Sequence, residues 1–124
     1  MSKHVLVVED EADLAEALQV ILESSGFEVE IARNGAEALR AIEGRMPALI
    51  ILDMLMPIMN GWEFAAEFER RHGHATNILV VTAADNPRQR ADEIGADAVL
   101  PKPFDIKTLL ARVHEFVNAP VHAG

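Results

Sequence analysis

The sequence predicts an α/β fold, in which a parallel sheet of five strands is covered by helices on both faces. Five short apolar or alternating runs take turns with five stretches of helical spacing, and no linker or low-complexity segment interrupts them. The 124 residues, half of them apolar, fit one compact domain with a sizeable core. Because strands that alternate with helices run parallel, we expect right-handed crossovers.

The first strand is predicted over Val5–Val8, a continuous apolar and β-branched run typical of a strand buried on both faces. Apolar residues then recur three and four positions apart, and Gly26 is a natural helix end. Asp10, with Asp13 three positions later, could cap this helix. Its predicted inward-facing residues are Leu14, Ala15, Leu18, Ile21 and Leu22.

The second strand, Phe27–Ile31, alternates apolar residues with glutamates, which predicts a half-exposed strand at an edge of the sheet. Asn34 and Glu37, three positions apart, resemble a capping box. They predict the start of a helix that ends near Gly44. Its inward-facing residues are Ala38, Leu39 and Ile42.

Two further apolar runs, Ala48–Leu52 and Ile78–Thr82, predict the third and fourth strands. Ala48–Leu52 and Val5–Val8 are the most apolar runs, so we expect them at the centre of the sheet. Between the third and fourth strands, Asn60 and Glu63 repeat the capping pattern. The apolar stripe of the helix that they start is Trp62, Ala65 and Phe68.

The last part of the chain predicts two helices and one short strand. Asn86 precedes a proline at the first helical position, and the helix from Pro87 to Ile94 is unusually polar. Ala98–Leu100 is a short strand, broken by Pro101.

The final helix is predicted to start at Asp105, with Phe104 and Leu109 at hydrophobic-staple positions. Its predicted buried stripe is Ile106, Leu109, Leu110, Val113 and Val117. The domain is therefore expected to span residues 1–118, with a flexible C-terminal tail over residues 119–124.

Composition excludes several classes of function. The formal net charge of −9 argues against direct binding of nucleic acid or of an anionic membrane surface. The absence of cysteine excludes disulfides and thiolate metal sites. The five histidines are dispersed, so no histidine metal site is predicted. No signal peptide and no stretch of membrane-spanning length is present, which leads us to expect a cytoplasmic protein without membrane insertion.

Polar residues follow the ends of four predicted strands. Glu9 and Asp10 follow the first, Asp53 the third and Lys102 the fifth, and Thr82 ends the fourth. Carboxyl ends of parallel strands meet at one edge of a sheet, where ligands bind. Clustered carboxylates need a cation, and oxygen ligands favour Mg²⁺.

In this arrangement Asp53 could act as a nucleophile toward a phosphoryl group, and Thr82 and Lys102 could hold the phosphoryl oxygens. Taken alone, each residue also has an ordinary interpretation. Asp53 could be a turn residue, Thr82 a β-branched strand former and Lys102 a solvated loop lysine. The combination favours the chemical interpretation, because separate strand ends carry it in one order.

From about Lys3 to Val117 the chain resembles the receiver domain of bacterial two-component response regulators, including the chemotaxis regulators. The resemblance rests on these segments together: Val7-Val8-Glu9-Asp10-Glu11, Leu52-Asp53-Met54-Leu55-Met56-Pro57 with Gly61, Val81-Thr82-Ala83, Gly95-Ala96-Asp97 and Lys102-Pro103-Phe104. It implies a flavodoxin-like (βα)5 fold of three layers with strand order 2-1-3-4-5, the order that the family's chemotaxis member exemplifies.

The resemblance also implies a function and its residues. Asp53 would accept a phosphoryl group from a sensor histidine kinase or a histidine phosphotransfer protein. Mg²⁺ would be held by Asp10 and Asp53, by Glu9 through a water molecule and by the backbone carbonyl of Leu55. Thr82 would be the switch hydroxyl, and Lys102 would form a salt bridge to the phosphoryl group. The Lys102-Pro103 peptide would be cis.

A receiver domain would act as a signalling module rather than a metabolic enzyme, with self-phosphorylation and slow autodephosphorylation as its only reactions. Its output partner would bind the face made by the fourth helix, the fifth strand and the fifth helix. Because the chain ends just after the fifth helix, we expect either a stand-alone regulator or a fragment of a larger protein, such as a hybrid kinase. The Met1 start and the form of the C-terminal end favour a stand-alone or N-terminal receiver.

The chain departs from the family at three positions. Val99 occupies the position of the usual switch aromatic, so switching must use backbone shifts after Thr82 and in the polar fourth helix. Leu55 and Ala84 occupy the positions that tune dephosphorylation, and neither side chain can hold an attacking water by a hydrogen bond. We therefore expect slow autodephosphorylation.

Two alternative functions, an enzyme and an interaction domain, belong to other functional classes. A phosphatase with an aspartyl nucleophile would need a second acid two residues after Asp53, where Leu55 stands. A receiver-like interaction domain that signals without phosphorylation would not need the intact set of acidic residues, threonine and lysine.

Overall fold

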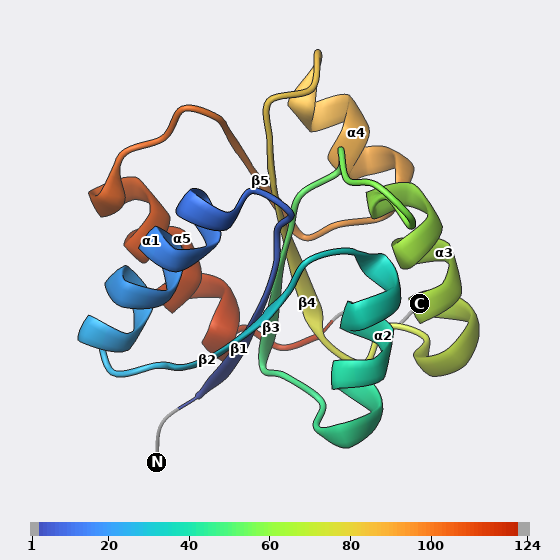
Figure 1. Cartoon of the computed structure of the whole chain (residues 1–124), viewed down its shortest axis with the longest axis horizontal. Helices are drawn as coiled ribbons and strands as arrows, with labels where there is room; N and C mark the ends of the chain where they lie inside the picture. The colour runs from blue at the N-terminus through green and yellow to red at the C-terminus, as the bar shows by residue number, and fades with distance from the viewer. Residues whose placement is uncertain (1–2, 122–124) are drawn as a thin grey trace.

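The computed structural model describes residues 3–121, which form five strands and five helices in strict alternation (Figure 1). The strands are β1 (His4–Val8), β2 (Glu28–Ala32), β3 (Leu49–Leu52), β4 (Asn77–Thr82) and β5 (Ala98–Pro101). The helices are α1 (Ala12–Ser24), α2 (Gly35–Gly44), α3 (Gly61–His72), α4 (Pro87–Glu93) and α5 (Ile106–Asn118).

All strand pairs are parallel, and the sheet has the order β2-β1-β3-β4-β5. This confirms the predicted flavodoxin-like fold. Every residue of β1, β3 and β4 is buried, whereas β2 alternates exposed and half-buried residues until its last position. The inner strands are thus the continuous apolar runs, and the alternating run forms an edge, as predicted.

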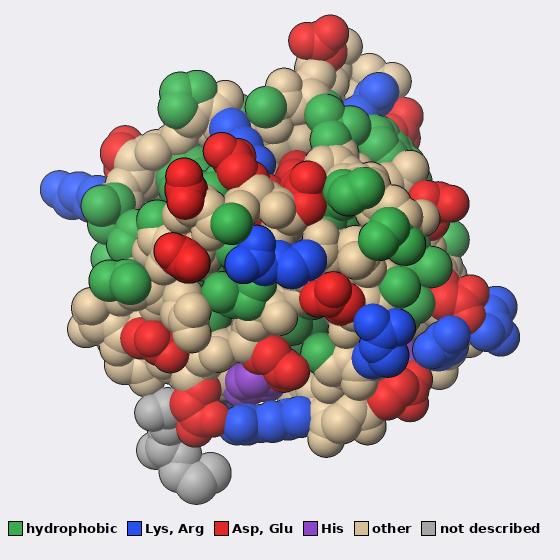
Figure 2. All heavy atoms as spheres, viewed as in Figure 1, with side chains coloured by type: hydrophobic (Ala, Val, Ile, Leu, Met, Phe, Trp, Pro, Cys, Tyr) green, Lys and Arg blue, Asp and Glu red, His purple; other side chains and the backbone are tan. Residues whose placement is uncertain are grey.

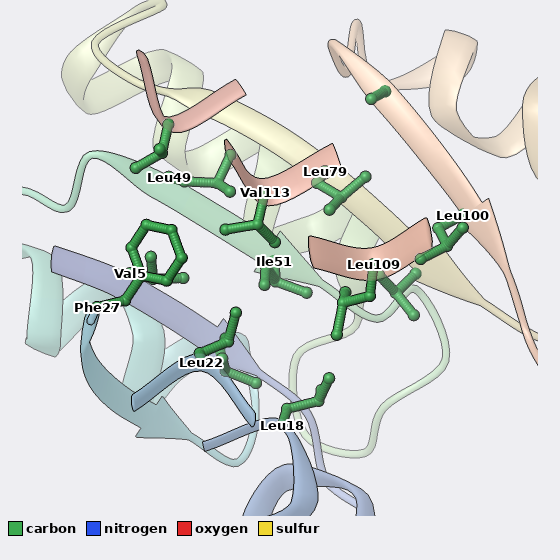
Figure 3. Packing of buried hydrophobic residues seen from close by; sticks show 14 residues of the cluster. Val5, Leu18, Leu22, Phe27, Leu49, Ile51, Leu79, Leu100, Leu109 and Val113 are labelled. Atoms are coloured by element: carbon green, nitrogen blue, oxygen red, sulfur yellow. The ribbon is translucent and has the colours of Figure 1, made fainter. Parts of the chain in front are cut away.

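Helices cover both faces of the sheet, and each face has its own apolar core. In Figure 1, α1 and α5 lie on one side of the sheet and α2, α3 and α4 on the other. Figure 3 shows the first core, where Leu18 and Leu22 of α1 and Leu109 and Val113 of α5 pack onto the strands. The second core, which includes Met54, lies under α2, α3 and α4.

Three helix starts are capped as the sequence predicts. Asn60 accepts the backbone N–H of Glu63, whose carboxylate accepts the N–H of Asn60, so this capping box is complete. Asn34 likewise accepts the N–H of Glu37 at the start of α2. The carboxylate of Glu37 accepts the N–H of Arg33, the residue before the cap, instead of the N–H of Asn34. Asp105 accepts the N–H of Thr108 at the start of α5.

Two local interpretations of the sequence were wrong. Asp10 does not cap α1, since the N-cap is Glu11 and its side chain makes no cap hydrogen bond. By contrast, α4 starts at Pro87 as predicted, and Asn86 precedes it in a left-handed conformation without a side-chain cap. Pro101 is the last residue of β5 rather than a break, because at an edge strand its missing N–H leaves no ladder bond unmade.

The predicted stripes of α3 and α5 also need correction. Ile106 is 54% exposed, because it is the first helical residue of α5 and lies beyond the edge of the first core. On α3 the fully buried aromatic residue that the stripe missed is Phe64, which stacks on Phe68. Trp62 is only half-buried.

Within residues 3–121, no helix has both the length and the apolarity needed to cross a bilayer. Helix α5 ends at Asn118, where the predicted domain ends. The flexible tail over residues 119–124 stays a prediction. Residues 122–124 lie outside the described part, and Asn77 donates a hydrogen bond to the carbonyl of Ala119.

Candidate functional site

The carboxyl ends of the strands bring the predicted site residues together. The register places Val8 of β1 opposite Leu52 of β3, so that Glu9 and Asp53 follow neighbouring strand ends. The N–H of Asp53 donates to the carbonyl of Val8 at 3.0 Å. On the other side, the N–H of Lys102 donates to the carbonyl of Thr82 at 2.9 Å. The four strand ends therefore meet at one edge of the sheet, as predicted.

Three carboxylates form the centre of this edge. Glu9, Asp10 and Asp53 each offer an oxygen, and these oxygens lie within 4.8 Å of one another. Glu9 and Asp53 are buried, and Asp10 is exposed. Figure 2 shows acidic side chains gathered near the top of the view, over this end of the strands.

The protein's own cation at the site is Lys102. Its Nζ lies 2.9 Å from Oε1 of Glu9 and 3.7 Å from Oδ2 of Asp53. One lysine therefore faces two buried carboxylates. The cluster as a whole keeps an excess of negative charge when all of its acids are ionised.

Burial is the main influence on the pKa values of the cluster. Burial, with a further contribution from the charge of Asp53, raises the pKa of Glu9 to about 6 despite its hydrogen bond to Lys102. Burial likewise raises the pKa of Asp53, against the opposing charge of Lys102. Burial disfavours the charge of Lys102, but its hydrogen bond to Glu9 and the charge of Asp53 outweigh this and raise its pKa.

A divalent cation would fit this donor set. Oxygen ligands that are clustered, partly buried and short of positive charge are those that bind Mg²⁺ in proteins, where the ion keeps part of its water shell. The exposed position of Asp10 leaves the cluster open to solvent on one side. Mg²⁺ is therefore compatible with the residues present.

Backbone groups orient both buried acids. The N–H of Leu55 donates to Oδ1 of Asp53 at 3.3 Å, and the N–H of Glu11 donates to Oε2 of Glu9 at 3.1 Å. Each of these bonds closes a short loop two residues long, so the acid and the loop after its strand move together. The side chain of Leu55 is 53% exposed beside Asp53.

Thr82 is the last residue of β4, as predicted, and its hydroxyl binds the backbone of the loop that follows the strand. The side chain is fully buried, and Oγ1 accepts the N–H of Ala84 at 3.1 Å. The hydroxyl is thus bound to the loop that leads into α4. A change of its hydrogen-bond partner would release the backbone of Ala84.

The predicted cis peptide between Lys102 and Pro103 is present. Next to it, an open groove of about 360 Å³ is lined by Leu14 of α1, Ala83, and Lys102-Pro103-Phe104. The groove gives the site an apolar border on the side of α1.

Two features of the site region were missed by sequence reasoning. Ile58, five residues after Asp53, has a φ of 67° and is 82% exposed, a rare conformation for a β-branched residue. The indole N–H of Trp62 donates to Glu93 of α4 at 2.9 Å. No local pattern signals either feature, since both depend on how the loop after Asp53 and the neighbouring helix are placed.

The methionines of that loop pack into the second core. Met54 is fully buried, and Met56 and Met59 pack against the second core. The carbonyl of Met59 accepts the N–H of Gly35, the first residue of α2. The loop is therefore in contact with both α2 and α3.

A family model described as response regulator receiver domain matches residues 5–114. The response regulator MprA of Mycobacterium ulcerans (strain Agy99) is 40% identical over 120 residues, which are 95% of this chain and 51% of MprA. The transcriptional regulatory protein PcoR of Escherichia coli is 38% identical over 118 residues, 94% of this chain and 52% of PcoR. The chain thus spans about half the length of the curated relatives it matches.

Solved structures agree with this similarity. The chemotaxis protein CheY4 of Vibrio cholerae superposes with a TM-score of 0.86 at 32% identity, over 94% of this chain and 99% of CheY4. The response regulator TrrA of Thermotoga maritima, solved in complex with Mg²⁺ and BeF, gives a TM-score of 0.81 at 33% identity, over 90% of this chain and 96% of TrrA.

Proposed function

The chain belongs to the response regulator receiver domains of two-component systems, and we propose that it is phosphorylated on Asp53. The observation that carries the proposal is the position of Asp53. It is a buried carboxylate beside two further acids, with Nζ of Lys102 at 3.7 Å.

The proposed reaction is a transfer from a phosphohistidine. An Oδ atom of Asp53 attacks the phosphorus, the new O–P bond forms, and the N–P bond of the donor histidine breaks. The imidazole leaves with the bonding electron pair and takes up a proton. The product is an acyl phosphate on Asp53, and the donor would be a sensor histidine kinase or a histidine phosphotransfer protein.

Asp10, Asp53 and the backbone carbonyl of Leu55 would hold Mg²⁺, and Glu9 would contact it through a water molecule. When bound, Mg²⁺ would neutralise charge on the carboxylates and on the phosphoryl oxygens. The closeness of the three carboxylate groups supports this assignment.

Lys102 and Thr82 are proposed to hold the phosphoryl group after transfer. Lys102 would exchange its contact with Glu9 for a phosphoryl oxygen, which is the stronger acceptor. The Thr82 hydroxyl would turn from Ala84 toward another oxygen, which would alter the loop before α4. Phosphorylation would then shift the balance between two conformations that a partner distinguishes.

The output partner is proposed to bind the face formed by α4, β5 and α5. A cavity of about 330 Å³ on this face is lined by charged side chains from α4 and α5, including Arg88 and Arg112. Helix α4 has only one buried residue, Ala91, so most of its surface is open to a partner. A cytoplasmic location, without membrane insertion or direct nucleic-acid binding, is part of the same proposal.

The experiment that tests the proposal is incubation with Mg²⁺ and a small phosphodonor such as acetyl phosphate, followed by intact-mass measurement. A labile single-phosphate adduct that is absent in Asp53→Asn supports phosphorylation of Asp53. Continuous release of phosphate at enzymatic rates would instead indicate an aspartyl phosphatase. No adduct in the unsubstituted protein would indicate an interaction domain that does not use phosphate.

A further inference from the structure

We propose that the hydrogen bond between Trp62 of α3 and Glu93 of α4 is a latch, closed in this structure, that opens when Asp53 is phosphorylated and so frees α4. This inference rests on the proposed function. Because Val99 stands in place of a switch aromatic, the latch would carry the signal from Asp53 to the surface of α4. The latch is defined here as the single contact from Nε1 of Trp62 to Oε1 of Glu93, 2.9 Å long.

Helix α4 is weakly held in the fold. It has seven residues, of which only Ala91 is buried. Residues with positive φ flank it, Asn86 at 52° and Gly95 at 66°. Within residues 3–121, the Trp62–Glu93 bond is the one side-chain hydrogen bond that ties α4 to another element. A helix with so little buried surface depends strongly on such a contact.

The other end of the latch is linked tightly to Asp53. Gly61, the residue before Trp62, donates its N–H to the carbonyl of Met54 at 3.0 Å. A Cβ at Gly61 would lie 2.6 Å from Sδ of Met54 and 3.0 Å from the carbonyl oxygen of Asp53, so the backbones are already in close contact. Movement of the Asp53–Met54 backbone must therefore move the first turn of α3.

Phosphorylation would cause such a movement. Asp53 is 5% exposed and its carboxylate is surrounded by Glu9, Lys102 and the N–H of Leu55. A phosphoryl group would add volume and charge directly beside these groups. The loop after Asp53 must adjust, and Trp62 lies at the end of that loop.

The latch can open at a small cost, because Glu93 has a second partner. The same Oε1 atom that accepts from Trp62 lies 3.1 Å from Nε of Arg90, one turn earlier in α4. The Glu93 side chain is already 39% exposed, so when Trp62 withdraws the carboxylate stays paired with Arg90 and in contact with water. Two states of similar stability are what a reversible switch requires.

Helix α4 is thus connected to the site at both ends. Its N-terminal end follows the Thr82–Ala84 hydrogen bond, and its C-terminal end carries the latch. Val99 packs against the same core as Trp62, but it has no ring that could swing between two positions. Trp62 therefore supplies the aromatic contact that Val99 cannot.

The test is hydrogen–deuterium exchange of the α4 amides over residues 88–94, measured with and without Mg²⁺ and acetyl phosphate. We expect the phosphodonor to speed α4 exchange about tenfold in the unsubstituted protein. Trp62→Phe keeps a ring and removes the N–H, so it should show about tenfold faster α4 exchange without phosphodonor, and little further change with it. Glu93→Ala, at an exposed position, should behave in the same way and does not disturb the core.

Asp92→Asn is the matched control, since it breaks the Arg88–Asp92 pair on the same helix and leaves the latch in place. It should keep the full response to the phosphodonor. Intact mass, recorded in parallel, separates the two hypotheses. An unsubstituted protein that forms no adduct overturns the proposed function. An adduct that forms with unchanged α4 exchange, or latch variants that exchange like the unsubstituted protein, overturns the latch.

Discussion

Lys102 lies closer to Glu9 than to Asp53, with its Nζ 2.9 Å from Oε1 of Glu9 and 3.7 Å from Oδ2 of Asp53. Both carboxylates are almost completely buried, so the lysine is an internal counter-ion for the acidic cluster. If Lys102 is to bind a phosphoryl group, it must leave Glu9. Another cation must then compensate the charge of Glu9, which connects the proposed magnesium site to the proposed role of the lysine.

Lys102→Met should therefore lower stability as well as reactivity. Removal of the ammonium leaves Glu9 buried without its charged partner, and we expect a loss of about 1–3 kcal/mol in the free energy of unfolding at pH 7. Urea denaturation without Mg²⁺ measures this. The double variant Glu9→Gln with Lys102→Met should regain most of the stability but not the rate of adduct formation. A double variant no more stable than Lys102→Met would show that the pair is not what holds the site together.

The stability of the metal-free protein should depend on pH through Glu9. Burial raises its pKa from 4.5 to about 6, so the folded state binds this proton more tightly than the unfolded chain. The resulting stabilisation is complete below pH 4.5 and is lost as the pH rises through about 6. We expect Glu9 to contribute about 1 kcal/mol less at pH 7 than at pH 5.

Urea denaturation at both pH values in the presence of EDTA checks the pH prediction, with Glu9→Gln as the reference that subtracts all other titrating groups. The difference between the two proteins should shrink when Mg²⁺ is added at pH 7. Equal pH dependence in the two proteins would show that Glu9 is not the group responsible.

Ile58 should be replaceable with a gain in stability. Its φ of 67° strains a β-branched residue, while its side chain is 82% exposed and has little packing to lose. Ile58→Gly and Ile58→Asn should each raise the free energy of unfolding by about 1 kcal/mol. Thermal or urea denaturation measures the gain. Ile58→Ala keeps a Cβ and should gain less than either, and an equal gain in all three would argue against backbone strain as the cause.

The acyl phosphate should be long-lived. Leu55 and Ala84 flank the site, and neither side chain can position a water for attack on phosphorus. Ala84→Glu and Leu55→Asn should each shorten the phosphoryl half-life, measured by loss of the adduct mass after the phosphodonor is removed. A half-life that is unchanged or longer in both variants would contradict this account.

Trp62 should report on the site by fluorescence. It is the chain's one tryptophan, and its indole binds Glu93 at the end of a loop that starts at Asp53. We expect titration with Mg²⁺ to change its emission, and Asp10→Asn to weaken the response. A flat titration of the unsubstituted protein would show that Trp62 does not sense the site.

Much of the fold could be predicted from the sequence, because each strand and helix carries its own periodicity. The continuous apolar runs gave β1, β3 and β4, and capping residues such as Asn60 and Asp105 marked helix starts. The errors lie where a position's burial depends on a distant element. Ile106 fits the apolar period of α5 but lies past the edge of the core, whereas Phe64 faces the second core beside Met54.

The members of the candidate site could be predicted, but their contacts could not. Topology alone brings Glu9, Asp53, Thr82 and Lys102 to one edge of the sheet. Whether Lys102 lies closer to Glu9 or to Asp53 depends on how its side chain extends within the folded site. The Trp62–Glu93 bond joins residues 31 positions apart on helices that no sequence pattern relates.

We expect the two apolar cores to differ in the substitutions that they tolerate during evolution. The methionines of the loop after Asp53 pack into the core beneath α2, α3 and α4, whereas α1 and α5 cover the other core. Substitutions inside the second core, beneath α2, α3 and α4, would disturb the loop after Asp53 and any signal that depends on it. The surfaces of α1 and α5 rest on a core that this loop does not enter. Descendants of this protein could therefore acquire new partners through the surface of α1 while the core beneath α2, α3 and α4 stays almost constant.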